Sequence, residues 1–218
     1  GWYKSPDQLS QQIFLKDFID DPVKNPLETP SGKIELFSKQ IDSFKYSDCV
    51  GHPKWYGDKE YLGNIKKYKL HLLSNQPKFK LHSQLDNGQV ADNEKSNGRA
   101  VIEVNKFDAE ARALSEKMVV KVFNDRGSCL AAVKISDNIT PGVANIPTGA
   151  WLDPLKSSGI SCVHGNPNVL TNDIGTSKLA QGPTAHTCLV EIEQFHEKVP
   201  RISAFDPPKI TAPNKERN

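Results

Sequence analysis

The stretch Met118-Val-Val-Lys-Val-Phe-Asn-Asp-Arg-Gly-Ser-Cys-Leu-Ala-Ala-Val-Lys-Ile135 gives the clearest indication of the fold. It holds two apolar runs rich in β-branched residues, at positions 118–123 and 129–135. The four residues Asn124-Asp-Arg-Gly127 between them are of the kind that form tight turns. Two such runs joined by a short polar turn predict a β-hairpin.

Further strand-like runs and short helices lie on either side of this hairpin. Strands are expected at residues 69–74, 101–104, 143–146 and 187–193, and a helix at 106–114 capped by Asn105. Turns are indicated at Asp86-Asn-Gly88 and Ser96-Asn-Gly98. Short strands with long connections predict a closed or partly closed barrel, or a two-sheet sandwich. Periodicity does not decide between these two folds.

The flanking regions have a different character from the part that is rich in strands. Residues 1–67 are expected to connect the barrel, at residues 68–196, to a preceding catalytic domain outside this sequence. Within them we expect a short amphipathic helix in residues 8–19, a strand at 33–38 and a helix at 39–44 capped by Ser38. Residues 197–218 are rich in Pro and Lys and are expected to form an irregular C-terminal tail with little to bury.

Composition and motifs exclude several classes of function. The net charge of +2 over 218 residues gives no general attraction to nucleic acid or membranes, and no apolar run approaches the roughly 20 residues that cross a bilayer. The four cysteines form no CxxC pair, and Cys129 and Cys188 are expected to be buried thiols. HExxH, GxSxG and Gly-rich phosphate motifs are absent. We therefore expect neither catalytic residues nor a metal site within this chain.

Two polar stretches are suited to binding a ligand. The first is Leu72-Leu-Ser-Asn-Gln-Pro-Lys-Phe-Lys-Leu-His-Ser-Gln84, which follows an expected strand. The second is His164-Gly-Asn-Pro-Asn-Val-Leu-Thr-Asn-Asp-Ile-Gly-Thr-Ser-Lys-Leu-Ala-Gln-Gly182. Glycine lets a backbone approach a ligand closely, and side-chain amides pair with both donors and acceptors. The two stretches predict loops that fold around a polar molecule.

Together these stretches resemble the C-terminal domain of the molybdenum reductases of the dimethyl sulfoxide, trimethylamine N-oxide and biotin sulfoxide type. The similarity extends over about residues 29–193 and is greatest to the trimethylamine N-oxide and biotin sulfoxide reductase branch. It includes Thr29-Pro-Ser-Gly-Lys33, His52-Pro-Lys-Trp55, the 123–127 turn and Pro147-Thr-Gly-Ala-Trp151. The resemblance implies a mainly β fold with short helices, a six-stranded double-psi β-barrel of mixed strand direction.

The resemblance also implies which residues contact a bis(molybdopterin guanine dinucleotide) molybdenum cofactor. The expected cofactor-binding residues are Ser74, Asn75, Gln76, His82, Ser83, Gln84, Asn166, Ser177, Gln181 and Gly182. Asn168 is expected to form a structural Asx turn, and Trp151 either to pack over the cofactor or to plug the barrel. Lys78, Lys80 or Arg99 could neutralise the phosphates, and the sequence does not distinguish among them.

The implied parent enzyme reduces S-oxides or N-oxides by oxygen-atom transfer, and this part of it would hold the cofactor without catalysing the reaction alone. Because the chain begins at Gly inside a folded-looking sequence, we expect it to be a fragment. The implied partners are the remaining domains and an electron donor such as a cytochrome, in the periplasm or alternatively the cytoplasm. The alternative function is a free-standing barrel that binds a nucleotide or another polar ligand without redox chemistry.

Overall fold

A computed structural model describes residues 13–57, 60–65, 67–155, 158–184, 186–208 and 210. The chain divides into two units, which are described separately. The first comprises residues 1–56 together with 177–179, and the second comprises residues 57–176 together with 180–218.

The first unit has little regular structure. Its helices are α1 (Lys16–Asp20) and α2 (Lys39–Ser43), and neither contains a buried residue. The Ser38 side chain accepts a hydrogen bond from the Ile41 amide at 3.3 Å, so the expected N-cap is confirmed. The strand expected at residues 33–38 is wrong, because that segment pairs with no strand and Ile34 and Leu36 are exposed. Of the helix expected at residues 8–19, positions 8–12 lie outside the described residues.

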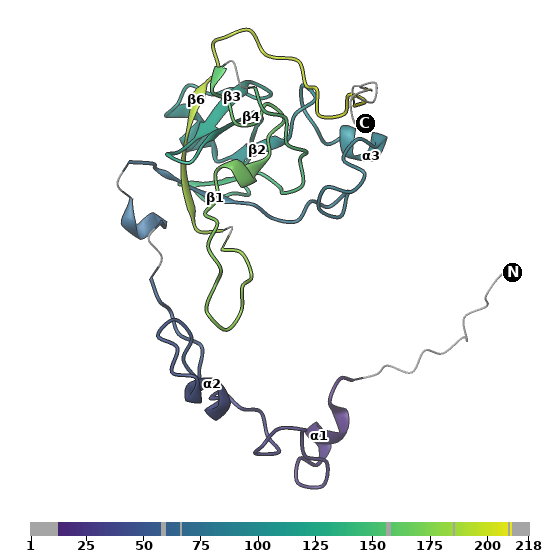
Figure 1. The fold of residues 1–218 in the computed structure, drawn as a ribbon, viewed down its shortest axis with the longest axis vertical. Helices are drawn as coiled ribbons and strands as arrows, with labels where there is room; N and C mark the ends of the chain where they lie inside the picture. Colours follow the sequence, from purple (N-terminus) through teal and green to yellow (C-terminus); the bar gives the residue numbers. More distant parts are fainter. Residues whose placement is uncertain are drawn as a thin grey trace, which may run out of the picture. The chain divides into compact units, whose positions relative to one another are not determined.

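The second unit is built on a closed barrel of six strands (Figure 1). The strands are β1 (Leu70–Leu73), β2 (Val101–Val104), β3 (Val119–Phe123), β4 (Ser128–Ile135), β5 (Val143–Asn145) and β6 (Cys188–Gln194). Around the barrel their order is β1-β5-β2-β4-β3-β6. The β1–β5 and β2–β4 pairs are parallel and the other four are antiparallel. The six-stranded barrel of mixed direction is confirmed, and the sandwich is excluded.

Alternating side chains fill the barrel interior. Val120 and Val122 of β3 are buried, whereas their neighbours in the strand are partly exposed, as the period of two requires. Strand β4 departs from this pattern, because its first six residues are all buried. Residues 160–163 cover this part of the strand: the Leu130 amide donates to the Cys162 carbonyl at 2.9 Å, and Ile160 and Val163 cluster with Leu130. This covering segment explains the continuous apolar run in the sequence.

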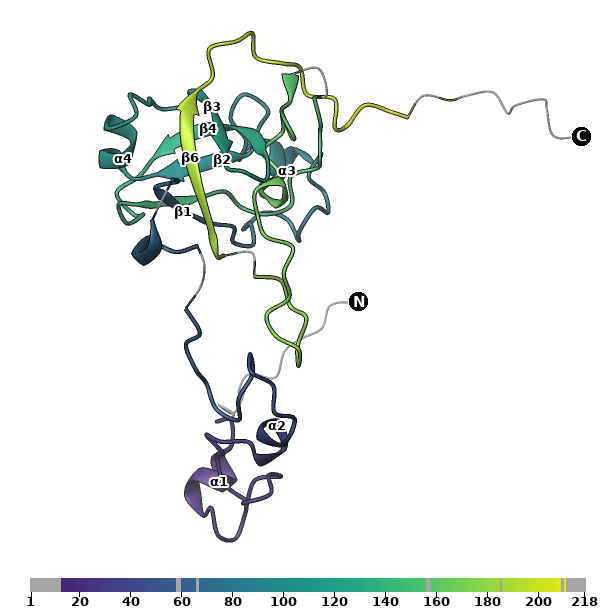
Figure 2. The same cartoon turned by 60° about the vertical axis from the view of Figure 1, so that its left-hand side comes forward.

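Short helices complete the second unit. They are η1 (Leu62–Asn64), α3 (Gln89–Asp92), α4 (Lys106–Glu110) and η3 (Pro167–Val169), with α3 and α4 on different sides of the barrel (Figure 2). Asn105 caps α4 through a hydrogen bond from the Phe107 amide at 3.0 Å, as expected. This helix is shorter than the sequence predicted, and Ala113 adopts a positive φ of 52° just after it. The α3 helix was not anticipated.

The cysteines are free thiols. Cys129 and Cys188 are buried, as expected, and so is Cys162. Burial is the largest influence on the Cys188 thiol and raises its pKa to about 11. The Cys188 thiol therefore remains protonated near neutral pH, and the three buried cysteines act as small apolar core residues.

Candidate functional site

The candidate site is formed where β1 and β5 end. Because the two strands are parallel, their following loops leave the barrel at the same end. We call residues 74–84 the β1 loop and residues 146–152 the β5 loop. Backbone pairing continues into both: Ile146 donates to the Leu73 carbonyl at 3.0 Å, and Thr148 donates to the Asn75 carbonyl at 2.9 Å. The β1 loop is thus fixed against the β5 loop by hydrogen bonds.

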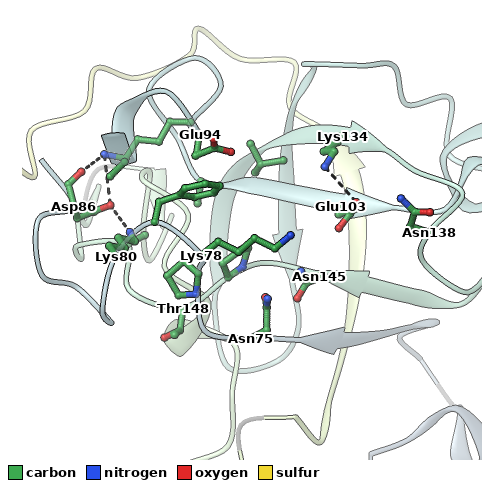
Figure 3. A pocket seen from close by; sticks show the side chains of 18 residues that line it. Asn75, Lys78, Lys80, Asp86, Glu94, Glu103, Lys134, Asn138, Asn145 and Thr148 are labelled. Carbon is green, nitrogen blue, oxygen red and sulfur yellow. Dashed lines mark hydrogen bonds and ion pairs between the residues drawn. The ribbon is translucent and has the colours of Figure 1, made fainter. Parts of the chain in front are cut away.

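A first cavity of about 520 Å³ lies beside these loops (Figure 3). Its polar and charged lining comes from Asn75, Lys78, Lys80, Asp86, Glu94, Lys95, Glu103, Lys134, Asn138, Asn145 and Thr148. In Figure 3 Lys80 and Asp86 lie at one end, Glu103 and Lys134 at the other, and Asn75 and Asn145 between them. Polar groups from β5 and both loops therefore face one space.

Asn145 is a lining residue that the sequence did not single out. It is the last residue of β5, and its buried Oδ1 has no hydrogen-bond partner among the described atoms. An unpaired buried amide oxygen costs about 1–3 kcal/mol, so this atom is suited to accept from a ligand donor. The available signal was a polar residue ending a short apolar run just before Pro147.

The structure distinguishes among the three cations that could neutralise phosphate. Lys80 pairs with Asp86, and the Arg99 guanidinium donates to the carbonyls of Asn97 and Pro200. By contrast, no carboxylate in the described part of the chain lies within ion-pairing distance of the Lys78 ammonium. Among these three, Lys78 is the cation in the first cavity left free for an anion.

Asp86 is the centre of a buried charge cluster. Its carboxylate is fully buried, pairs with Lys80, lies 3.5 Å from the Lys95 ammonium and accepts from the Trp151 amide at 3.1 Å. Burial alone would raise the pKa of Asp86, but the Lys80 hydrogen bond, the Trp151 amide and the two positive charges lower it below its ordinary value. The carboxylate therefore stays ionised and holds the start of α3 and the end of the β5 loop together.

A second cavity, also of about 520 Å³, shares Thr148 and Ala150 of the β5 loop with the first. Its lining residues are His82, Ser83, Thr148, Gly149, Ala150, Trp151, Leu152, Asn166 and Asn168. The two polar stretches, far apart in sequence, therefore meet at this cavity.

The β1 and β5 loops touch closely at Gly149. This residue has a φ of +95°, and a Cβ placed on it would lie 1.9 Å from the His82 carbonyl oxygen. His82 itself has a positive φ of 50°. Only glycine accommodates both the backbone conformation and the contact.

Other predicted residues of the β1 loop have local roles. Ser74 is buried, and its amide donates to Nδ1 of His186 at 3.2 Å. The Gln76 side chain donates to the Lys80 carbonyl at 3.3 Å. Gln84 is exposed, and its amide closes a turn with Leu81. These three residues line neither of the two cavities, and a cofactor role for them stays a prediction.

In the second polar stretch, the Asx turn forms at a different asparagine from the one expected. The Asx turn expected at Asn168 is made by Asn166, whose Oδ1 accepts from the Asn168 amide at 2.9 Å. Asn166 still lines the second cavity, and so does Asn168. The proline between them explains the position of the Asx turn, because it is the first residue of η3 and makes Asn166 the capping position.

The remaining predicted residues lie further along that stretch. Gln181 and Gly182 belong to a hairpin in which the Thr176 amide donates to the Gly182 carbonyl at 2.9 Å. Neither lines the two cavities. Ser177 groups with the first unit. All three therefore stay predictions as cofactor-binding residues.

Comparison with known proteins identifies the family. Residues 70–189 match the family described as "Molydopterin dinucleotide binding domain". Trimethylamine-N-oxide reductase 1 of Escherichia coli O157:H7 is 45% identical over 90% of this chain and 24% of its own length. Biotin sulfoxide reductase of Cereibacter sphaeroides is 43% identical over 83% of this chain and 24% of its own length.

A solved structure supports the fold alone. Acetylene hydratase from Pelobacter acetylenicus superposes with a TM-score of 0.63 at 17% identity, over 80% of this chain and 25% of its own. The chain belongs to the molydopterin dinucleotide binding domain family, and the resemblance in its sequence is confirmed. It spans about a quarter of the length of the curated relatives it matches.

Among the side chains that the structure describes, no three His, Cys, Asp or Glu residues are grouped so that they could hold a metal ion. No helix in the described ranges is long and apolar enough to span a membrane.

The contact between the loops predicts that Gly149→Ala is more costly than Gly159→Ala. Both glycines have positive φ, but a Cβ at Gly159 meets nothing within 4 Å. Each variant should lose about 1–2 kcal/mol from backbone strain, and Gly149→Ala about 1–3 kcal/mol more from the steric clash. Denaturant unfolding measures both free energies. Equal losses would show that the loops do not touch at Gly149.

The Asp86 cluster predicts a pH-dependent stability. Asp86→Asn leaves Lys80 and Lys95 buried without a counterion, which should cost about 3 kcal/mol near neutral pH. Because the folded-state pKa of Asp86 lies below its ordinary 3.8, its contribution is complete above that value and is lost as the pH falls through the folded pKa. The difference between wild type and variant should therefore shrink in acid.

Unfolding curves measured across the acidic range test this pH dependence. The control is Asp137→Asn, which removes a carboxylate that is 72% exposed and pairs with Lys106, and should cost under about 0.5 kcal/mol. A wild-type-like Asp86→Asn would contradict the assignment.

Proposed function

We propose that this chain holds the bis(molybdopterin guanine dinucleotide) cofactor in a molybdenum enzyme that reduces S-oxides or N-oxides. The observation that carries the proposal is the pair of cavities with polar residues in their linings that share Thr148 and Ala150 of the β5 loop. Both lie at one end of a barrel from the dinucleotide-binding family. The reductase activity is inferred from relatives whose names specify trimethylamine N-oxide, dimethyl sulfoxide and biotin sulfoxide.

The residues present fit such a cofactor. A pterin dinucleotide has many ring donors and acceptors, together with two negatively charged phosphates. Asn145 offers a buried oxygen without a partner, and Asn75, Asn166 and Thr148 add amides and a hydroxyl. Gly149 leaves no side chain between the two loops. This lining satisfies polar groups that would be costly to bury unpaired.

Two cavities favour the form of the cofactor with two dinucleotide arms. Each has a volume within the range of about 300–1,000 Å³ that is typical of ligand sites. They share Thr148 and Ala150, so a single loop would contact both arms. We therefore assign one arm to each cavity.

Lys78 would contact phosphate in the first cavity. Its ammonium is free of carboxylate partners, whereas Lys80 and Lys134 are engaged with Asp86 and Glu103. A lysine acts on phosphate as a point charge on a flexible stem. The neighbouring ion pairs keep the other lysines from competing with it.

The division of labour follows from this assignment. The bound cofactor supplies oxygen-atom transfer, and this chain binds and orients its dinucleotide arms. We assign no catalytic residue to this chain. The remaining domains of the parent enzyme would hold the metal centre and admit the substrate, and an electron donor such as a cytochrome would reduce the enzyme. A periplasmic location, with the cytoplasm as the alternative, is proposed from the resemblance alone.

Mass spectrometry of ligands released from the purified full-length protein tests this function. The expected result is a pterin guanine dinucleotide at about two per molybdenum atom. A correctly matured protein with neither pterin nor molybdenum would contradict the proposal and favour a free-standing binding module. One dinucleotide per metal would contradict the assignment of an arm to each cavity.

Lys78→Ala should weaken cofactor retention roughly tenfold, because a charge-assisted contact to phosphate is lost. The measurement is the rate of pterin release from the full-length protein, followed by fluorescence, and the effect should diminish at high salt. Lys69→Ala, at an exposed position just before β1, is the control and should behave as wild type. Identical release from both variants would refute a phosphate role for Lys78.

A further inference from the structure

Trp151, at the end of the β5 loop, is held by three hydrogen bonds. Its amide donates to Oδ2 of Asp86 at 3.1 Å, and its indole Nε1 donates to the Ser83 carbonyl at 2.8 Å. Its carbonyl lies 3.1 Å from Nδ1 of His164. These partners come from the β1 loop, the start of α3 and the second polar stretch. Trp151 therefore ties together the segments that line the second cavity.

The C-terminal region packs against the Trp151 side chain. The Phe205 ring lies edge-on to the Trp151 ring, with centroids 5.1 Å apart, and edge-on to His164 at 5.0 Å. The Lys95 ammonium lies 4.6 Å from the Phe205 ring centroid. Edge-to-face ring pairs and cation–π contacts are both favourable geometries. The tail was expected to have little to bury, but Phe205 is half-buried.

A buried carboxylate fastens the same region. Asp153, only 4% exposed, accepts from the Ser203 amide at 2.6 Å, the Ser203 hydroxyl at 2.7 Å and the Ala204 amide at 3.0 Å. Buried Arg99 donates to the Pro200 carbonyl. Asp153 lies two residues after Trp151, so residues 200–206 are anchored directly beside the β5 loop.

Residues 200–206 also pack against His164, a buried side chain. Its side chain is fully buried, and its Nε2 has no partner among the described atoms. Burial lowers the pKa of His164 more than the Trp151 carbonyl and Asp86 raise it, so the ring is neutral. Its Nδ1 carries the proton, because that atom faces the Trp151 carbonyl. Phe205 packs on this ring and would exclude the water that a bare Nε2 would attract.

We propose that residues 200–206 are a positioning segment for the cofactor site, with Phe205 as the residue that fixes Trp151 and through it the β5 loop. This inference rests on the proposed function for its link to the cofactor. Residues of this loop line both cavities. Release of the segment would free Trp151 to move at the second cavity, and both dinucleotide arms would lose a fixed contact surface.

Hydrogen exchange of the full-length protein, with and without cofactor, tests the positioning. Phe205→Ala should speed exchange at residues 148–152 by about tenfold, the order expected for losing two edge-to-face contacts. Exchange in β4 should not change, which separates loop release from general unfolding. Phe205→Tyr should restore slow exchange, since the ring is retained. Phe107→Ala, which removes an exposed ring on α4 that has a cation–π contact with Lys106, is the matched control.

The rate of pterin release from the same variants tests the link to the cofactor. Phe205→Ala should release pterin about tenfold faster, and Phe205→Tyr and Phe107→Ala should behave as wild type. Unchanged exchange at residues 148–152, or faster exchange with unchanged release, would overturn the proposal. If the wild-type protein contains no pterin, the proposed function fails, and exchange in the cofactor-free protein still decides whether Phe205 fixes the loop.

Discussion

The parallel pairing of β1 with β5 is the constraint on which the site depends. Register places Leu73 beside Asn145, so the residues that follow each strand emerge together at one end of the barrel. An antiparallel pair would send the two loops to opposite ends. Hydrogen bonds between the loops extend this pairing beyond the strands. Backbone pairing in the barrel thereby brings residues about 70 positions apart in the sequence into the lining of one cavity.

Most of the charged side chains around the first cavity are paired with one another. Asp86 is buried and ionised, which requires cations close by. Lys80 and Lys95 form ion pairs with Asp86, so their charges stabilise the fold and are not free to bind a ligand. Glu103 engages Lys134 in the same way at the far end. Among the described residues, Lys78 is then the lysine of this cavity without a carboxylate partner, so an anion would be bound at one position.

Local patterns in the sequence predicted much of the fold and part of the site. Alternation in residues 119–123 and the turn that follows predicted the central hairpin, because strand period and turn chemistry are encoded locally. The 33–38 segment also alternates, but it is not a strand, since alternation does not supply a pairing partner. The polar stretches predicted His82, Ser83 and Asn166 as neighbours of a ligand, and the structure places all three around the second cavity.

The features of the site that were not predicted depend on contacts between residues far apart in the sequence. Asn145 was not singled out because its importance comes from an unpaired oxygen in a cavity, not from a motif. Phe205 stands in a Pro-rich tail, and only the fold brings it to Trp151, 54 positions earlier. The position of the Asx turn, at Asn166 instead of Asn168, depends on where η3 begins, which composition does not determine.

The most direct test of this account is an experimental structure of the full-length protein with its cofactor bound. We expect dinucleotide density in both cavities, in contact with Thr148, with phosphate near Lys78 and a ring donor facing Oδ1 of Asn145. Dinucleotide bound at the opposite end of the barrel, where β1 and β5 begin, would contradict it.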